Sequence, residues 1–168
     1  MSVSHGRPSD DATGLRFGIV AAQWNEGIVR RLVDGACETL RARGAADADV
    51  EVSWVPGSYE LPLAAKWAAE GRTSAGSPGP GARIDAVIAL GCVIRGETEH
   101  FRLVADAASQ GLLRVALDTG VPVLNGVLAV ENAGQADARS GGEHGNTGSQ
   151  AALAAVRMAN LRRGKWAS

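Results

Sequence analysis

The stretch Ala86-Val-Ile-Ala-Leu-Gly-Cys-Val-Ile94 is the longest near-continuous apolar run of the chain, and it indicates the fold. At nine residues it is far shorter than the roughly 18 apolar residues of a membrane-spanning helix. Short apolar runs rich in Val and Ile are typical of strands that are buried on both faces, as in a parallel sheet. We therefore predict a buried strand here, at residues 84–91, which is the most apolar strand candidate of the chain.

Segments on both sides of this run alternate between strand and helix patterns. Apolar stretches predict further strands at 16–22, 50–55 and 121–128. Helical spacing of apolar residues predicts helices at 26–43, 60–69, 98–117, 131–139 and 149–163. Strands that alternate with helices favour a parallel sheet covered on both faces, because right-handed crossovers place the helices there. The expected fold class is α/β, a three-layer α/β/α sandwich with a four-stranded parallel sheet.

The composition fits one domain and disfavours several classes of function. A chain of 168 residues, 45% of them hydrophobic, is long enough to bury one core. Its 17 Lys and Arg nearly balance 18 Asp and Glu, so the net charge of −1 gives no reason to bind nucleic acid or an anionic membrane. Nothing before Phe17 resembles a signal peptide, which predicts a cytoplasmic protein.

Glycine-rich and polar segments predict where the chain is irregular. We expect residues 1–14 to form a disordered tail and residues 15–168 to form the single domain. The Gly/Pro/Ser-rich segment 71–83 predicts a flexible surface loop, and 140–148 predicts a second loop. The two cysteines share no CxxC spacing and the three histidines lie far apart, so we expect no metal site.

The residues that follow each predicted strand are the candidates for a site, because open parallel sheets bind ligands beyond the carboxyl ends of their strands. Trp24 and Tyr59 suit a stacking platform for a flat, polar heterocycle, or equally rings that cap the core. Glu60 suits either the dipole of a helix start or ligand hydroxyls. The four segments are Trp24-Asn25, Pro56-Gly57-Ser58-Tyr59-Glu60, Cys92-Val93-Ile94-Arg95-Gly96-Glu97-Thr98-Glu99-His100 and Asn125-Gly126.

Polar residues after the third strand point to an anion and to proton transfer. The backbone N–H groups of Gly96-Glu97-Thr98 lie at a predicted helix start, where anions such as phosphate bind. His100 is a candidate proton acceptor and Arg139 a candidate for bidentate phosphate binding, although each alone would also suit a solvated surface. The helix dipole favours a neutral imidazole, whereas Glu97 and Glu99 favour the protonated form, so the sequence leaves its resting charge open.

Several short motifs occur in a specific order along the chain. They are Val55-Pro-Gly-Ser-Tyr-Glu-Leu-Pro62, Ala89-Leu-Gly-Cys-Val-Ile-Arg-Gly-Glu-Thr-Glu-His-Phe101, Asn125-Gly-Val-Leu128, Glu131-Asn132, Gln135-Ala136 and Gly145-Asn146. Together they resemble the 6,7-dimethyl-8-ribityllumazine synthase family of riboflavin biosynthesis. The resemblance extends from Phe17 to Asn160, leaves out the tail and the 71–83 segment, and implies a flavodoxin-like form of the sandwich.

The resemblance implies the condensation of 5-amino-6-(D-ribitylamino)uracil with 3,4-dihydroxy-2-butanone 4-phosphate, which releases phosphate and water and needs no cofactor and no metal. His100 would be the general acid/base and Trp24 would stack on the pyrimidine. Arg139 and the backbone of Glu97 and Thr98 would hold the phosphate. The other implied substrate-binding positions are Ser58 and Tyr59 along the ring, Glu60 at the ribityl chain, Cys92, Val93 and Ile94 through backbone contacts, and Asn125, which would close the pocket from a neighbouring subunit.

The resemblance also implies an assembly. Members of the family form pentamers, and some form icosahedral shells of pentamers, so a homo-oligomer is expected here. Riboflavin synthase is the candidate protein partner.

Five positions depart from the commonest family pattern. Asn125 stands where an aromatic residue is frequent, and Ala129-Val130 replaces two threonines. Thr147 stands where lysine is usual, and Gln150 where an acidic residue often pairs with the phosphate-binding arginine. We therefore predict a weaker affinity for the phosphorylated substrate than is usual in the family. The alternatives are a riboflavin synthase of the same fold, which would have no use for a phosphate site, and a non-catalytic shell protein that binds a flavin or lumazine.

Overall fold

The computed structural model describes residues 6–72 and 83–165, and its centre is a four-stranded parallel sheet in the order β2-β1-β3-β4. The strands are β1 (Phe17–Ala22), β2 (Val50–Val55), β3 (Ala86–Ile94) and β4 (Val123–Val130). All three neighbouring pairs are parallel, with Phe17 opposite both Val50 and Ala86, and Ile88 opposite Leu124. The predicted four-stranded parallel sheet is confirmed, although β3 and β4 each begin and end later than predicted.

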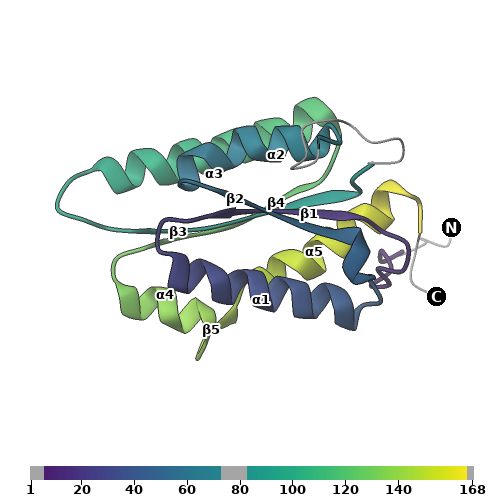
Figure 1. Cartoon of the computed structure of the whole chain (residues 1–168), viewed down its shortest axis with the longest axis horizontal. Coiled ribbons are helices and arrows are strands. Elements are labelled where there is room, and N and C mark those ends of the chain that lie inside the picture. The colour runs from purple at the N-terminus through teal and green to yellow at the C-terminus, as the bar shows by residue number, and fades with distance from the viewer. Residues whose placement is uncertain (1–5, 73–82, 166–168) are drawn as a thin grey trace, which may run out of the picture.

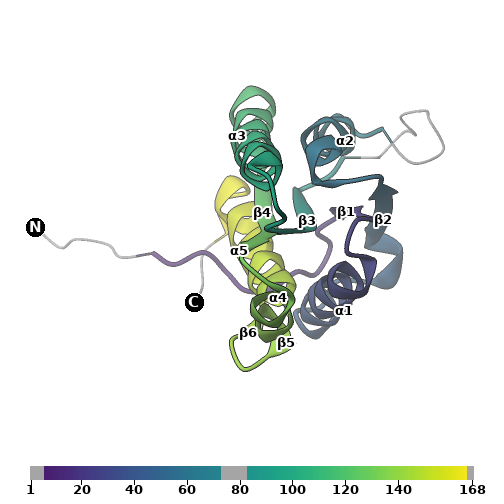
Figure 2. The same ribbon diagram turned by 90° about the vertical axis from the view of Figure 1, so that its left-hand side faces the viewer.

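Helices cover both faces of this sheet, as Figures 1 and 2 show. One layer contains α2 (Leu61–Ala69) and α3 (His100–Thr119), and the other contains α1 (Glu26–Ala42), α4 (Ala133–Arg139) and α5 (Thr147–Arg162). Two short 3-10 helices, η1 (Asp47–Asp49) and η2 (Ser58–Glu60), border β2. The predicted three-layer α/β/α sandwich of flavodoxin-like type is therefore confirmed. None of the helices in the described residues is long and apolar enough to cross a membrane.

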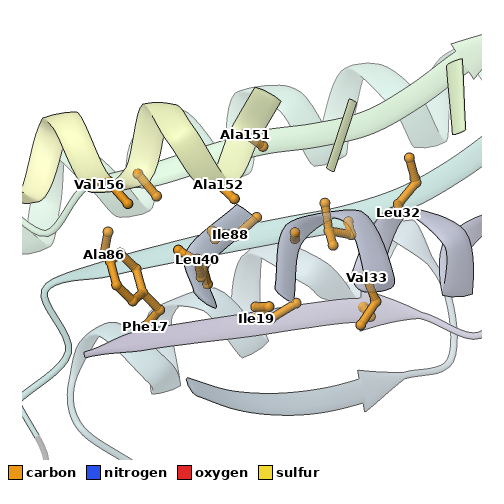
Figure 3. Packing of buried hydrophobic residues seen from close by; sticks show 14 of the residues in the cluster. Phe17, Ile19, Leu32, Val33, Leu40, Ala86, Ile88, Ala151, Ala152 and Val156 are labelled. Carbon is orange, nitrogen blue, oxygen red and sulfur yellow. The ribbon is translucent and has the colours of Figure 1, made fainter. Parts of the chain in front are cut away.

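The two central strands hold the core together because both of their faces are covered. Every residue of β1 is buried, with alternate side chains facing opposite helix layers. Figure 3 shows the larger cluster, in which Ile19 and Ile88 of the sheet meet Leu32 of α1 and Val156 of α5. Burial of these apolar side chains is the main force that fixes the strands and hence the segments that leave them.

Helices α1 and α5 approach each other at glycine positions. A Cβ atom at Gly148 would lie 1.9 Å from the carbonyl oxygen of Leu32, so any larger residue is excluded there without movement of a helix. Asn146 caps α5 by accepting a hydrogen bond from the N–H of Ser149 (3.1 Å) and donates to the carbonyl of Arg31 (2.8 Å). The Gly145-Asn146-Thr147-Gly148 segment therefore serves helix packing.

An ion pair between the buried Asp85 carboxylate and the partly exposed Arg163 ties the end of α5 to the start of β3. Asp85 is 2% exposed and accepts two hydrogen bonds from the guanidinium of Arg163, at 2.9 and 2.8 Å. The backbone N–H of Arg16, just before β1, donates to the same carboxylate at 2.8 Å. These contacts join three distant segments at the amino end of the sheet.

The predicted disordered tail at 1–14 is wrong for Ser9 to Gly14, which pack along α5. Asn160 donates through its side-chain amide to the carbonyls of Ser9 and Asp11, both at 2.8 Å, and Ala12 is fully buried. Asp10 forms an ion pair with Arg157 at 2.6 Å, and this hydrogen bond lowers the pKa of the carboxyl group. The composition of this segment favoured disorder. The burial of Ala12 and the two hydrogen bonds from the Asn160 side-chain amide hold it in place instead. Residues 1–5 lie outside the described residues.

The two predicted loops have different outcomes. Most of the predicted 71–83 loop lies outside the described residues, because only its ends at 71–72 and at residue 83 are described. The predicted 140–148 loop is corrected, since it contains the antiparallel strands β5 (Ser140–Gly142) and β6 (Gly145–Asn146), and α5 begins at Thr147. Gly141 and Gly145 have φ values of 115° and 76°, which glycine adopts without steric cost and which let the chain reverse.

Candidate functional site

A pocket of about 390 Å³ lies beyond the carboxyl end of β3, where the segments after β1, β2 and β3 meet. Nine of the twelve predicted site residues line it, and Glu97, Asn125 and Arg139 do not. The complete lining is Trp24, Gly57, Ser58, Tyr59, Glu60, Cys92, Val93, Ile94, Gly96, Thr98, His100, Phe101 and Val104. The predicted convergence of post-strand segments is therefore confirmed for three of the four.

The two predicted aromatic residues of the pocket, Trp24 and Tyr59, do not cap the core. Trp24 is 72% exposed and Tyr59 is 65% exposed, so both present ring surface to solvent. The N–H of Trp24 donates to the carbonyl of Pro56 at 3.2 Å, which holds the β1–α1 turn beside the β2–η2 turn. Exposed aromatic faces that border a concave site are suited to stacking on a planar ring.

Asn25 shapes the turn that carries Trp24, and the sequence interpretation assigned it no role. It is the non-glycine residue with positive φ in the described chain, at φ 60° and ψ 42°. Its side-chain amide donates to the carbonyl of Cys92 at 2.8 Å, and its own carbonyl accepts the N–H groups of Ile28 and Val29 at the start of α1. Asparagine tolerates this left-handed conformation better than most residues do, which was the available signal.

The β2–η2 segment supplies one buried and one exposed polar group. Ser58 is 4% exposed, and a Cβ atom at Gly91 would lie 2.5 Å from its hydroxyl, so glycine on β3 makes room for this serine. Glu60 is exposed at the N-cap of α2, where its side chain makes no capping hydrogen bond. Its carboxylate is thus free to accept hydrogen bonds from ligand hydroxyls.

Cys92 contributes to the pocket as a buried neutral thiol. Its side chain is 1% exposed, and burial raises its pKa to about 11. Because a thiolate is the nucleophilic form, this residue is poorly suited to covalent catalysis at neutral pH. The predicted packing role fits this environment.

His100 is the first residue of α3 and lies exposed at the wall of the pocket. Its backbone N–H is 3.4 Å from the hydroxyl of Thr98. Phe101 and Val104 line the same wall, and the sequence interpretation did not include them. The helical spacing of 100 and 104, together with the adjacent 101, was a signal that they share one side of the helix start.

Arg139 and Asn125 lie outside the pocket of this chain. Arg139 ends α4, and its side chain donates to the carbonyl of Gln135 at 3.2 Å. Asn125 lies opposite Ala89 inside β4 and bonds to the hydroxyl of Ser109 at 3.3 Å, so its predicted place beyond the strand end is wrong. The strand continues because Val127 to Val130 remain apolar and pair with β3.

Comparisons with known proteins identify the family of this chain. The family model described as 6,7-dimethyl-8-ribityllumazine synthase matches residues 14–163. A protein of that name from Stenotrophomonas maltophilia (strain R551-3) is 51% identical over 146 residues, which cover 87% of this chain and 88% of the relative. Another of that name from Xanthomonas campestris pv. campestris (strain B100) is 48% identical over 149 residues, which cover 89% and 90%. The chain therefore belongs to the 6,7-dimethyl-8-ribityllumazine synthase family.

Proposed function

We propose that this protein condenses 5-amino-6-(D-ribitylamino)uracil with 3,4-dihydroxy-2-butanone 4-phosphate to form 6,7-dimethyl-8-ribityllumazine, in the cytoplasm and as a step of riboflavin biosynthesis. The observation that carries the proposal is the pocket that is lined both by two exposed aromatic rings, Trp24 and Tyr59, and by a histidine at a helix start. A planar pyrimidine between Trp24 and Tyr59 would present its amino group to the rest of the pocket.

The proposed chemistry consists of steps that need proton transfer. The amino group attacks the ketone and water leaves to give an imine, phosphate is then eliminated, and ring closure releases water again. His100 would donate and accept these protons, since it lies at the pocket wall and reaches solvent. Holding the two substrates together would supply much of the acceleration. Glu60 would bind the ribityl hydroxyls, while Ser58, Cys92, Val93 and Ile94 would border the pyrimidine.

The phosphate of the four-carbon substrate would bind at the start of α3. Glu97 and Thr98 do not belong to the helix as predicted but come just before Glu99, the N-cap of α3, so their backbone N–H groups lie near the end of the helix whose dipole favours an anion. Arg139 would add a bidentate contact, but it lies outside the lining of the pocket in a single chain. We therefore assign Arg139, with Asn125 on the open edge of β4, to the site of a neighbouring copy in a homo-oligomer.

Exposed apolar side chains support such an assembly. Leu103, Leu113 and Leu117 on α3 are 66%, 61% and 75% exposed. Large apolar groups of this exposure on one helix are typical of a surface that another protein covers.

The first test is to incubate the purified protein with both substrates and to follow the absorbance of the lumazine. A blank without protein is required, because the condensation also proceeds slowly unaided. Acceleration is expected, with His100→Ala lowering kcat at least about 100-fold. An elevated KM for the phosphorylated substrate is expected from Thr147 and Gln150, relative to family members that carry lysine and an acidic residue at these two positions. Tight binding of the lumazine without acceleration would instead favour the non-catalytic shell protein.

The second test addresses the shared site. His100→Ala and Arg139→Ala are each expected to be nearly inactive when expressed alone. Co-expressed, they would form mixed oligomers in which some sites combine an intact His100 from one copy with an intact Arg139 from the next. Partial recovery of activity supports the shared site, whereas no recovery in verified mixed oligomers contradicts it.

A further inference from the structure

The segment between β3 and α3 carries His100 and Phe101 to the pocket without regular structure of its own. Residues 95–99 belong to neither element, and Glu99 at the N-cap of α3 makes no side-chain capping hydrogen bond. The contact from His100 to the Thr98 hydroxyl is long, at 3.4 Å. Local interactions therefore leave the direction of the His100 turn weakly determined, and a contact from elsewhere in the fold is needed to fix it.

Arg95 provides contacts on both sides of this segment. Its guanidinium carbon lies 5.5 Å from the centre of the Phe101 ring, within the range of a cation–π interaction. Its Nη1 atom donates to the carboxylate of Glu131 at 3.1 Å, just beyond β4. Its backbone N–H donates to the carbonyl of Val130 at 2.8 Å. One side chain thus joins the residue after His100 to the end of a different strand.

Glu131 is itself held in place, which makes it a suitable anchor. Its backbone N–H donates to the side-chain carbonyl of Gln135 at 2.9 Å. Asn132 caps α4 by accepting the N–H of the same Gln135 at 3.0 Å. The partner of Arg95 therefore lies directly before the N-cap of α4, the helix that ends in Arg139, and two hydrogen bonds to Gln135 hold this helix start.

We propose that Arg95 is a positioning residue that sets the orientation of His100 by clamping Phe101 against the Glu131 end of α4. The proposal rests on the proposed function, since it assigns the orientation of the group that would transfer protons there. The Arg95 and Glu131 side chains are 50% and 56% exposed, and exposed ion pairs contribute little to the free energy of unfolding. The value of the clamp therefore lies in geometry, to which catalysis is sensitive.

The test compares Arg95→Gln with Arg102→Gln. Arg102 is a matched control, because it is an exposed arginine in the first turn of α3 whose partner, Glu99 at 3.5 Å, belongs to the 95–99 segment itself. Arg95→Gln is expected to lower kcat about ten-fold while KM and the dissociation constant of the lumazine change less than about two-fold. Arg102→Gln is expected to retain kcat within about two-fold. Arg95→Lys keeps the positive charge but loses the planar group that stacks on Phe101, so its kcat is expected to lie between those of Arg95→Gln and Arg102→Gln.

A readout independent of activity is hydrogen exchange of the peptide that covers residues 95–103. Exchange is expected to become faster in Arg95→Gln and Glu131→Gln but to stay unchanged in Arg102→Gln, with an unchanged melting temperature in all three. If the wild-type protein accelerates no reaction, the proposed function fails and the clamp fails with it. If the wild type is active and Arg95→Gln matches Arg102→Gln, only the clamp is overturned. Equal losses of kcat and lumazine affinity with a lower melting temperature would show a general structural role and would also overturn it.

Discussion

Replacing Gly148 by alanine is expected to force α1 and α5 apart. The added Cβ atom would lie 1.9 Å from the Leu32 carbonyl oxygen and 2.7 Å from its carbon, whereas real Cβ contacts are essentially never closer than 3.0 Å. The obstacle is backbone, which no rotamer change can move aside. The helices must therefore separate by about 1 Å or more, which loosens the packing of Leu32 and Val156 in the larger core cluster.

The expected cost follows from overpacking of a dense core. Such changes lower the free energy of unfolding by about 1–3 kcal/mol. Because the obstacle here is rigid backbone, we expect a loss at the upper end of this range, about 3 kcal/mol. For a domain of this length that corresponds to a fall in Tm of roughly 6–12 °C. Differential scanning calorimetry at one fixed protein concentration measures it, because an oligomer's Tm depends on concentration.

Gly27→Ala is the matched control within the same pair of helices. Gly27 lies in the first turn of α1, and a Cβ atom there would have nothing within 4 Å. Alanine is a better helix former by roughly 0.5–1 kcal/mol, so Tm is expected to rise slightly. A Gly148→Ala protein that melts within about 2 °C of the wild type, or a Gly27→Ala protein that falls equally far, would refute the close-approach argument.

Three further substitutions or reactions test other features. Asp85→Asn is expected to lower the free energy of unfolding by about 2 kcal/mol in urea denaturation, because Arg163 loses its buried counter-charge but keeps some solvent contact. An unchanged free energy of unfolding would show that the ion pair does not stabilise the fold. Asn25→Ala is expected to lower the free energy of unfolding by about 1–2 kcal/mol, and Asn25→Gly by less, since glycine adopts positive φ freely. An equal loss of stability in both variants would assign the effect to the hydrogen bond with Cys92 alone. Burial raises the pKa of Cys92 to about 11, so the thiol is expected to resist alkylation by iodoacetamide at about pH 8 and to react as the pH approaches its pKa. Site-resolved mass spectrometry measures the extent of alkylation. Rapid alkylation near neutral pH would contradict a neutral thiol.

The sheet was predictable because its strands are local apolar runs. Phe17–Ala22 and Val50–Val55 need only short-range pattern recognition, since β-branched residues between polar or glycine-rich segments favour strands. The ends of β3 and β4 were harder to locate, because β3 continues to Ile94 and β4 to Val130, beyond the predicted ends at residues 91 and 128. Their final residues pair with each other, and this pairing is a tertiary contact that no local pattern contains.

The site, too, contains residues that the sequence could place and residues that it could not. Residues within a few positions of a strand end, such as Trp24 and His100, were placed at the pocket by topology alone. Asn25 and Arg95 act through partners 67 and 36 positions away, and such contacts depend on the fold being formed first. Ser9 to Gly14 escaped prediction for a related reason, because a polar segment becomes ordered when a distant amide satisfies its carbonyls.

The Asp85–Arg163 pair and the packed Ser9–Gly14 segment lie at the amino end of the sheet, whereas the pocket lies at the carboxyl end of β3. Selection for heat resistance often conflicts with turnover when both requirements fall on the same residues. Here the two sets of residues are separated by the length of the strands. Laboratory evolution should therefore be able to raise thermal stability first, through substitutions at the amino end of the sheet. Substitutions at the carboxyl end could afterwards change activity with little loss of that stability.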